Sequence, residues 1–72
     1  MKQEQIGLNA GITWRTLSKE NRKVAFDELT TLTALSPLEL AAAIGWLSRE
    51  DKILFSLENG EGYYTVYQEC YY

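Results

Sequence analysis

The stretch SPLELAAAIGWLSRED, residues 36–51, carries the clearest helix-starting signal in the chain. Ser36 is a residue type that caps helices, and Glu39 stands three positions later, as a capping box requires. Pro37 fits the first helical position, where its missing N–H is harmless. Apolar residues then follow at helical spacing and predict one buried stripe, made of Leu40, Ala43, Ile44 and Leu47. We therefore predict a helix here that ends in the polar run SREDK.

A first helix is predicted over residues 4–19, because apolar residues recur on one of its faces: Ile6, Ala10, Thr13, Trp14 and Leu17. This face places the large side chain of Trp14 in the core. Gly7 and Gly11 lie one turn apart on the same helix, and each glycine costs a helix about 1 kcal/mol relative to alanine. Two explanations for them stay open, a close approach by another element and a frayed first turn.

A second helix is predicted from Phe26, Leu29 and Leu32, which have helical spacing. Its three threonines make it weak on propensity alone, so tertiary packing must stabilise it. The residues just before it, 23–25, offer the option of a very short strand. The residues just after it, 33–35, form a tight connection to the capped helix.

The end of the chain predicts a β-hairpin. The segment KILFSLE, residues 52–58, alternates apolar residues on one face, namely Ile53, Phe55 and Leu57. The segment YYTVYQECYY, residues 63–72, is rich in residues that favour strands. The Asn-Gly pair in the intervening ENGEG favours a tight two-residue turn. We interpret Cys70 as a small, half-buried strand residue.

The resulting order of helix, short strand, helix, tight turn, helix and hairpin is typical of a winged helix-turn-helix domain. The apolar residues around the tight turn fit the helix-turn-helix pattern: Leu29, Leu32, Leu35, Leu40 and Ile44. We predict an α+β fold with three helices and a C-terminal β-hairpin wing, forming one domain over residues 1–72. A chain this short buries only about 60% of its unfolded surface, so a homodimer would add stability.

Two runs also resemble a family of small bacterial and archaeal winged helix-turn-helix proteins of unknown function. They are IGLNAGITWRTL, with its G-x-x-x-G-x-x-W spacing, and LSPLELAAAIGWLSREDKI. The resemblance extends over roughly residues 5–57; it implies the fold and says little about activity. One departure concerns the turn, where many helix-turn-helix proteins have glycine and this chain has Ala34. Alanine makes a left-handed backbone there more costly.

Composition excludes several kinds of site. The chain has no histidine and one cysteine, so the usual zinc sites and a Cys–His nucleophile pair are excluded. It has no glycine-rich phosphate loop, and no cofactor or metal is expected. No apolar run approaches the ~18 residues that span a bilayer, and the first residues lack the apolar core of a secretion signal. We expect a cytoplasmic protein that is not an enzyme.

Charge is distributed unevenly along the chain. Residues 1–23 hold five basic and two acidic residues, a net charge of +3, whereas residues 24–72 hold two basic and eight acidic residues, a net charge of −6. The acidic part contains the third helix and the wing, which would approach DNA in the usual docking of this fold. Phosphate binding needs cations, so the surface argues against DNA although the fold argues for it.

The outward side of the third helix is the candidate interface, made of Leu38, Ala41, Ala42, Gly45, Trp46 and Arg49. Only Arg49 on this side has a side chain suited to reading base edges. We therefore predict a non-enzymatic protein-interaction or dimerisation module, with a homodimer as the most economical assembly. A DNA-binding transcriptional regulator is the alternative, and an exposed alanine-rich face with no partner is the simplest interpretation of the helix.

Three further features allow more than one interpretation. The basic residues Arg15, Lys19, Arg22 and Lys23 form either a solvated face or a docking surface for an acidic partner or nucleic acid. Trp46 is either at the edge of the core or an interface anchor. The tyrosines favour packing across strands over stacking on single-stranded bases, because only Glu69 and no cation lies among them: Tyr63, Tyr64, Tyr67, Tyr71 and Tyr72.

Overall fold

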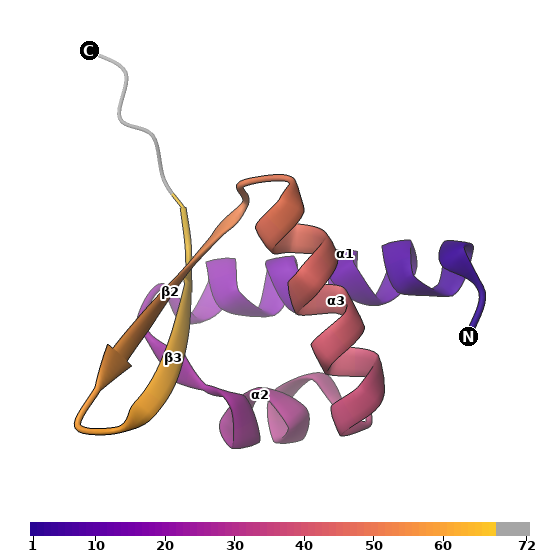
Figure 1. Ribbon diagram of the computed structural model, residues 1–72. Coiled ribbons are helices and arrows are strands. Elements are labelled where there is room, and N and C mark those ends of the chain that lie inside the picture. The colour runs from indigo at the N-terminus through magenta and orange to yellow at the C-terminus, as the bar shows by residue number, and fades with distance from the viewer. Residues whose placement is uncertain (68–72) are drawn as a thin grey trace, which may run out of the picture.

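The computed structural model describes residues 1–67, so the predictions for Cys70, Tyr71 and Tyr72 lie outside the described residues. Its elements, in chain order, are α1 (Gln3–Glu20), β1 (Val24–Ala25), α2 (Phe26–Thr33), α3 (Pro37–Arg49), β2 (Ile53–Glu58) and β3 (Glu61–Val66). The strands form one antiparallel sheet in the order β1-β3-β2. Figure 1 shows α3 crossing α1, with the hairpin beside the C-terminal end of α1. This arrangement confirms the predicted winged helix-turn-helix fold and its short first strand.

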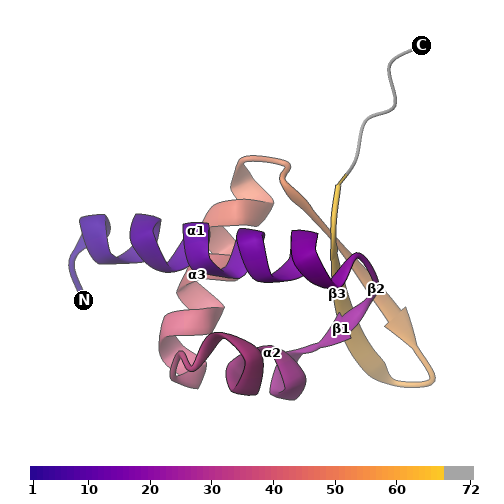
Figure 2. The same cartoon turned by 180° about the vertical axis from the view of Figure 1, so that it is seen from behind.

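The capping box holds the start of α3 as predicted. The backbone N–H of Glu39 donates a hydrogen bond to Ser36 Oγ over 3.2 Å, and the backbone N–H of Ser36 donates one to Glu39 Oε1 over 3.0 Å. Both donors would otherwise be unsatisfied at a helix N-terminus. The first turn of α3 is therefore fixed directly after the tight connection that leaves α2 (Figure 2).

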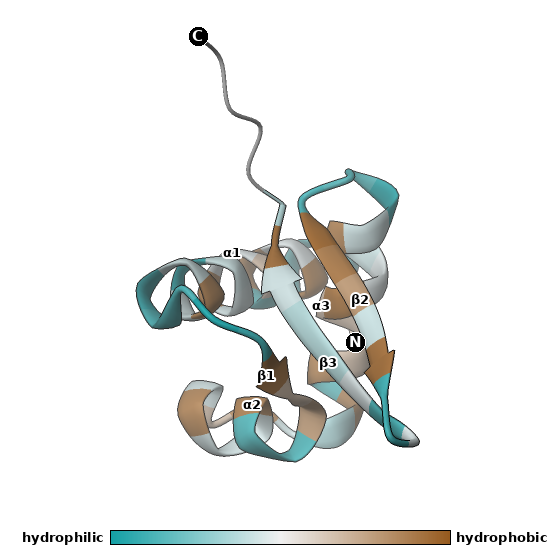
Figure 3. Cartoon of the chain, turned by 90° about the vertical axis from the view of Figure 1, so that its left-hand side faces the viewer, coloured by the Kyte–Doolittle hydropathy of each residue, from teal (hydrophilic) through white to brown (hydrophobic). Residues whose placement is uncertain are grey.

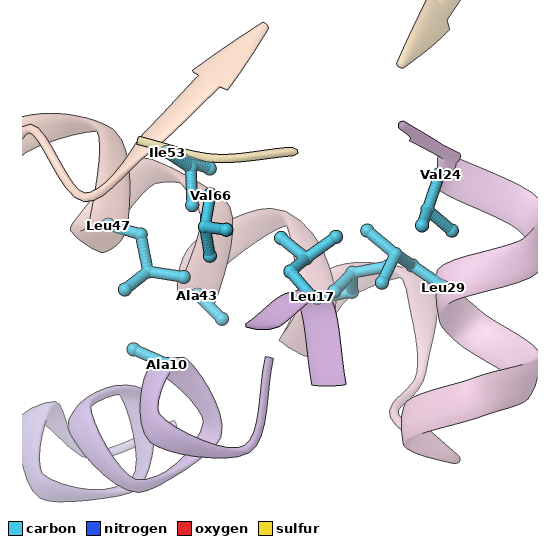
Figure 4. Packing of buried hydrophobic residues seen from close by; sticks show 9 residues of the cluster. Ala10, Leu17, Val24, Leu29, Ala43, Leu47, Ile53 and Val66 are labelled. Atoms are coloured by element: carbon cyan, nitrogen blue, oxygen red, sulfur yellow. The ribbon is translucent and has the colours of Figure 1, made fainter. Parts of the chain in front are cut away.

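The core lies where the three helices meet the base of the hairpin. Its buried apolar residues come from every element, and Figure 4 shows most of them together: Ala10, Leu17, Val24, Leu29, Leu40, Ala43, Leu47, Ile53 and Val66. Full burial of each leucine stabilises the fold by about 1.5–3 kcal/mol. The predicted inward stripe of α3 is confirmed, with Ile44 half-buried at its side.

The prediction that Trp14 belongs to the core is wrong, because 41% of this residue is exposed. The buried face of α1 is centred on Asn9, Thr13 and Leu17, each separated by four residues. Trp14 lies at the side of this face, where α1 borders α3. Its indole therefore lines the surface between the two helices and does not enter the core.

Other apolar residues expected to be buried are also exposed. Leu32 on α2 is 43% exposed, although it fits the helix-turn-helix pattern. On β2, Ile53 is buried, whereas Phe55 and Leu57 on the same face are 58% and 67% exposed. The outer half of the hairpin stands away from the helices (Figure 1), and no element within residues 1–67 covers that face of β2, which Figure 3 shows as largely hydrophobic. The alternation correctly predicts a strand but does not predict how far the core extends along it.

The hairpin turn has the predicted form. Glu58 pairs with Glu61 across the turn, and the two intervening residues, Asn59 and Gly60, have φ values of 51° and 81°. Positive φ at both central residues is the requirement of a type I′ turn, which is why Asn-Gly is favoured there.

Ala34 adopts a left-handed backbone, with φ 60° and ψ 19°, at the end of α2. A residue with a Cβ atom loses roughly 1–2 kcal/mol in this conformation, whereas glycine adopts it without that penalty. The alanine therefore stores strain at the turn between α2 and α3.

We predict that Ala34→Gly raises the free energy of unfolding by about 0.5–1 kcal/mol, because relief of the strain exceeds the extra entropy that glycine adds to the unfolded chain. The control is Ala41→Gly in the exposed interior of α3, which should lower stability by about 1 kcal/mol. Urea unfolding of both variants checks this. Equal destabilisation by the two glycines would contradict a left-handed Ala34.

Candidate functional site

The predicted interface residues lie together on the outer side of α3. Leu38 is 71% exposed and Trp46 is 37% exposed. Ala41, Gly45 and Arg49 are also exposed, whereas Ala42 is half-buried. Five of the six candidate residues therefore face solvent, and the surface they form is apolar up to its C-terminal end, where Arg49 stands.

A groove of about 400 Å³ borders this surface, between α1 and α3. Trp14 on α1 and Trp46 on α3 both line it, together with small residues and a charged rim: Gly7, Ala10, Gly11, Leu47, Arg15, Glu50 and Lys52. Two half-exposed tryptophans on one groove present a large apolar area. Such side chains are the ones that contribute most at protein interfaces. We call this feature the tryptophan groove.

Gly7 lies beside Trp46 in the tryptophan groove. A Cβ atom on Gly7 would lie 3.9 Å from Cζ2 of Trp46, so the indole ring rests against the backbone of α1. Helix α1 begins at Gln3 and continues past both glycines, so Gly7 lies within a formed helix and not in a frayed turn. The neighbour of Gly11 is the Arg15 side chain of the same helix. The frayed first turn is therefore wrong, and the structure has room for a Cβ atom at Gly7, so close approach by another element does not require glycine there.

The parts of the fold that would approach DNA carry negative charge. At the start of α3, the hydrogen bond from the Ser36 backbone N–H lowers the pKa of Glu39, so this carboxylate stays ionised. At the wing tip, Glu58 and Glu61 face each other across the turn, and both are exposed. The hydroxyl of Tyr63 donates a hydrogen bond to Glu61 over 2.9 Å, which raises the pKa of that tyrosine. The start of α3 and the wing tip therefore carry carboxylates, which repel phosphate, although Lys23 forms an ion pair with Glu58.

The four candidate basic residues do not form a continuous line of free cations. Arg22 lies beyond the end of α1 and forms ion pairs with Glu20, at 2.7 Å, and with Glu28. This contact lowers the pKa of Glu28 and raises that of Arg22. Lys23 Nζ lies 3.2 Å from Glu58 Oε2.

The other two basic residues, Arg15 and Lys19, are exposed on α1 and have no ion pair within residues 1–67. Only half of the candidate basic surface is therefore free to attract an anionic partner. Arg15 also lies at the rim of the tryptophan groove.

Asn9 is a buried polar residue that the sequence reasoning missed. It is only 2% exposed, where α1 meets the rest of the fold. Its Oδ1 accepts a hydrogen bond from Gln5 Nε2 over 3.3 Å, and its Nδ2 has no hydrogen-bond partner within the described residues. The spacing of Asn9, Thr13 and Leu17 by four residues indicates the buried face. Asparagine is usually exposed, however, so residue type alone favours Trp14 as the core residue.

Within residues 1–67, no three potential ligand side chains gather as a metal site would need. The helices of the same part of the chain include none that is long and apolar enough to cross a bilayer.

Comparison with known proteins agrees with this fold. Residues 1–67 match the sequence model of a family described as a winged helix-turn-helix domain, DUF2582. The solution NMR structure of protein BT2368 from Bacteroides thetaiotaomicron is similar, with a TM-score of 0.83 and 32% sequence identity. The similarity covers 92% of this chain and 79% of that one. No curated protein matches the chain.

The Glu39 carboxylate should make stability depend on acid pH. Its pKa in the folded state lies below the ordinary value of 4.5, so its contribution is fully present above that pH and is lost as the pH falls through the folded pKa. The variant Glu39→Gln keeps a hydrogen-bond acceptor but does not titrate. We predict that the native chain is more stable than Glu39→Gln at pH 7 and that this difference shrinks by pH 3.

Urea unfolding at the two pH values measures the difference. The control is Glu50→Gln, which removes an exposed carboxylate with no side-chain hydrogen bond among residues 1–67. A difference for Glu39→Gln that stays constant between pH 7 and pH 3 would contradict the role of this carboxylate.

Proposed function

We propose that this chain, which belongs to the winged helix-turn-helix domain family DUF2582, uses its third helix to bind protein, as a non-enzymatic interaction module that works as a homodimer. The observation that carries the proposal is the surface of α3. Where this fold usually meets the major groove, the helix exposes Leu38, Ala41 and Gly45, and its only cation is Arg49 at the far end.

Burial of apolar area supports a protein partner for this surface. The exposed residues of α3 adjoin the tryptophan groove, where Trp14 and Trp46 remain 41% and 37% exposed. Each indole has a large apolar area still in contact with water, and covering it on binding is favourable. The charged rim of Arg15, Glu50 and Lys52 resembles the polar border of a protein interface. The single cysteine of the chain supports a cytoplasmic setting for the module.

A DNA-binding transcriptional regulator is the second candidate, and the fold itself favours it. Against it stand Glu39 at the start of α3 and the two glutamates of the wing tip. Non-specific DNA affinity comes mainly from neutralised phosphates, and this surface offers almost no cation for them.

We expect no mobility shift of a random DNA duplex by the native chain at ~50 mM salt, the condition that favours non-specific binding. The double variant Leu38→Arg, Ala41→Arg should produce a shift, because it supplies cations on the exposed side of α3. The matched control, Leu38→Glu, Ala41→Glu, changes the same positions with the opposite charge and should not. A shift by the native chain would overturn the proposal in favour of DNA binding.

A further inference from the structure

Strand β2 is an open edge of the sheet. The strand order β1-β3-β2 leaves one side of β2 without a neighbour within the described residues. The backbone N–H of Tyr67 donates a hydrogen bond to the carbonyl of Lys52 over 2.9 Å. Because the direction of backbone groups alternates along a strand, the even-numbered residues of β2 bond to β3. The backbone groups of Ile53, Phe55 and Leu57 therefore point to the open side.

This edge lacks the features that usually protect a strand from pairing. Its register with β3 is continuous from Ile53–Val66 to Glu58–Glu61, so it contains no bulge. No proline and no lysine lies within Ile53–Glu58. Three of its side chains are exposed and apolar, with Leu54 at 49%, Phe55 at 58% and Leu57 at 67%. An exposed apolar edge of this length is a template for a further strand.

The hairpin also holds this edge in a fixed shape. Phe55 rests on Gly62, where an added Cβ atom would lie only 2.6 Å from Cε1 of the ring. The same ring lies 5.3 Å from that of Tyr64, centre to centre. Contacts within one hairpin thus order the strand before any partner arrives, which reduces the entropy that pairing would cost.

We propose that a second copy of this chain pairs with the edge, so that the two β2 strands run antiparallel about a two-fold axis at Phe55. In this register, Phe55 lies opposite its own counterpart, and Ile53 lies opposite Leu57 of the partner subunit. All three outward-facing residues then meet outward-facing residues, and the two sheets join into one of six strands.

Charge complementarity selects a second copy as the occupant. The register that centres on Phe55 also places Lys52 opposite Glu58 of the partner subunit, and it does so at both ends of the pairing. These two residues are the charged ends of an otherwise uncharged segment. Both are even-numbered, so they form non-hydrogen-bonded pairs, in which side chains lie closest. The neighbouring registers move every partner by two residues. Lys52 would then lie opposite Ser56 or opposite a residue beyond the end of β2. Some outward-facing backbone groups of β2 would have no partner within the opposite strand.

This inference rests on one part of the proposed function, namely that the domain binds protein. It assigns the homodimer contact to β2 and leaves α3 and the tryptophan groove for another protein. The two surfaces share no residue except Lys52, which lies at the rim of the groove. They can therefore be disturbed separately.

Amide hydrogen exchange by NMR at two protein concentrations tests the paired edge directly. The amides of Leu54, Ser56 and Glu58 bond to β3 and should be protected at both concentrations. The amides of Phe55 and Leu57 point to the open side, and their protection should increase at least tenfold at the concentration where sedimentation shows a dimer. Rapid exchange of Phe55 and Leu57 in the dimer would overturn the inference.

A charge swap tests the register. Lys52→Glu and Glu58→Lys each place like charges opposite each other twice per dimer, and each should raise the dissociation constant by roughly tenfold at low salt. The double variant restores opposite charges and should regain an affinity near that of the native chain. Glu58→Lys also removes the ion pair with Lys23, so circular dichroism must show that each variant is folded; the double variant lacks that ion pair too.

The variant Ala42→Glu separates this inference from the proposed function. It changes the α3 surface and should leave the dimer and the protection of Phe55 and Leu57 intact. If Ala42→Glu dissociates the dimer and the charge swap does not, the β2 contact is wrong, whereas protein binding through α3 stands. A native chain that sediments as a monomer at all concentrations overturns both the β2 contact and the homodimer of the proposed function, and the DNA mobility shift then still decides between protein and DNA as the partner of α3.

Discussion

The packing of α3 against α1 is the constraint on which the rest of the molecule depends. One side of α3 faces the core through Leu40, Ala43 and Leu47. These side chains belong to the same buried cluster as Ala10 and Leu17 of α1. This choice of face determines which side of α3 remains outside. The two large indole rings lie at the border between the helices, where they line the groove beside Gly7, Ala10 and Gly11. The core and the tryptophan groove are therefore two results of one helix crossing.

The features that follow from local chemistry could be predicted from the sequence. The capping box at Ser36 and the Asn59-Gly60 turn each depend on neighbouring residues alone, and both form as expected. The inward stripe of α3 was likewise predictable, because helical spacing is a strong pattern. The short strand β1 could only be an option, since its two residues gain a partner from β3, about forty residues later in the chain.

Features that depend on where the core ends could not be predicted in this way. Phe55 and Leu57 alternate correctly with Ile53, yet they are exposed because the hairpin extends past the helices. Trp14 has the spacing of a core residue, but it is 41% exposed, whereas the polar residue Asn9 is buried. Helical spacing predicts which residues of α3 share the outward side. It does not predict the groove beside them, because the groove depends on how α1 crosses α3. Ion pairs such as Arg22 with Glu28 also depend on the turn between α1 and α2.

The contact between Phe55 and Gly62 links two positions that the sequence alone would treat as independent. A larger side chain at position 62 displaces the ring, and loss of the ring exposes the glycine backbone to water. The effect of changing one residue thus depends on which residue occupies the other, and substitutions at the two sites are not additive. In the evolution of this hairpin, the aromatic ring and the glycine beneath it should be retained or replaced together.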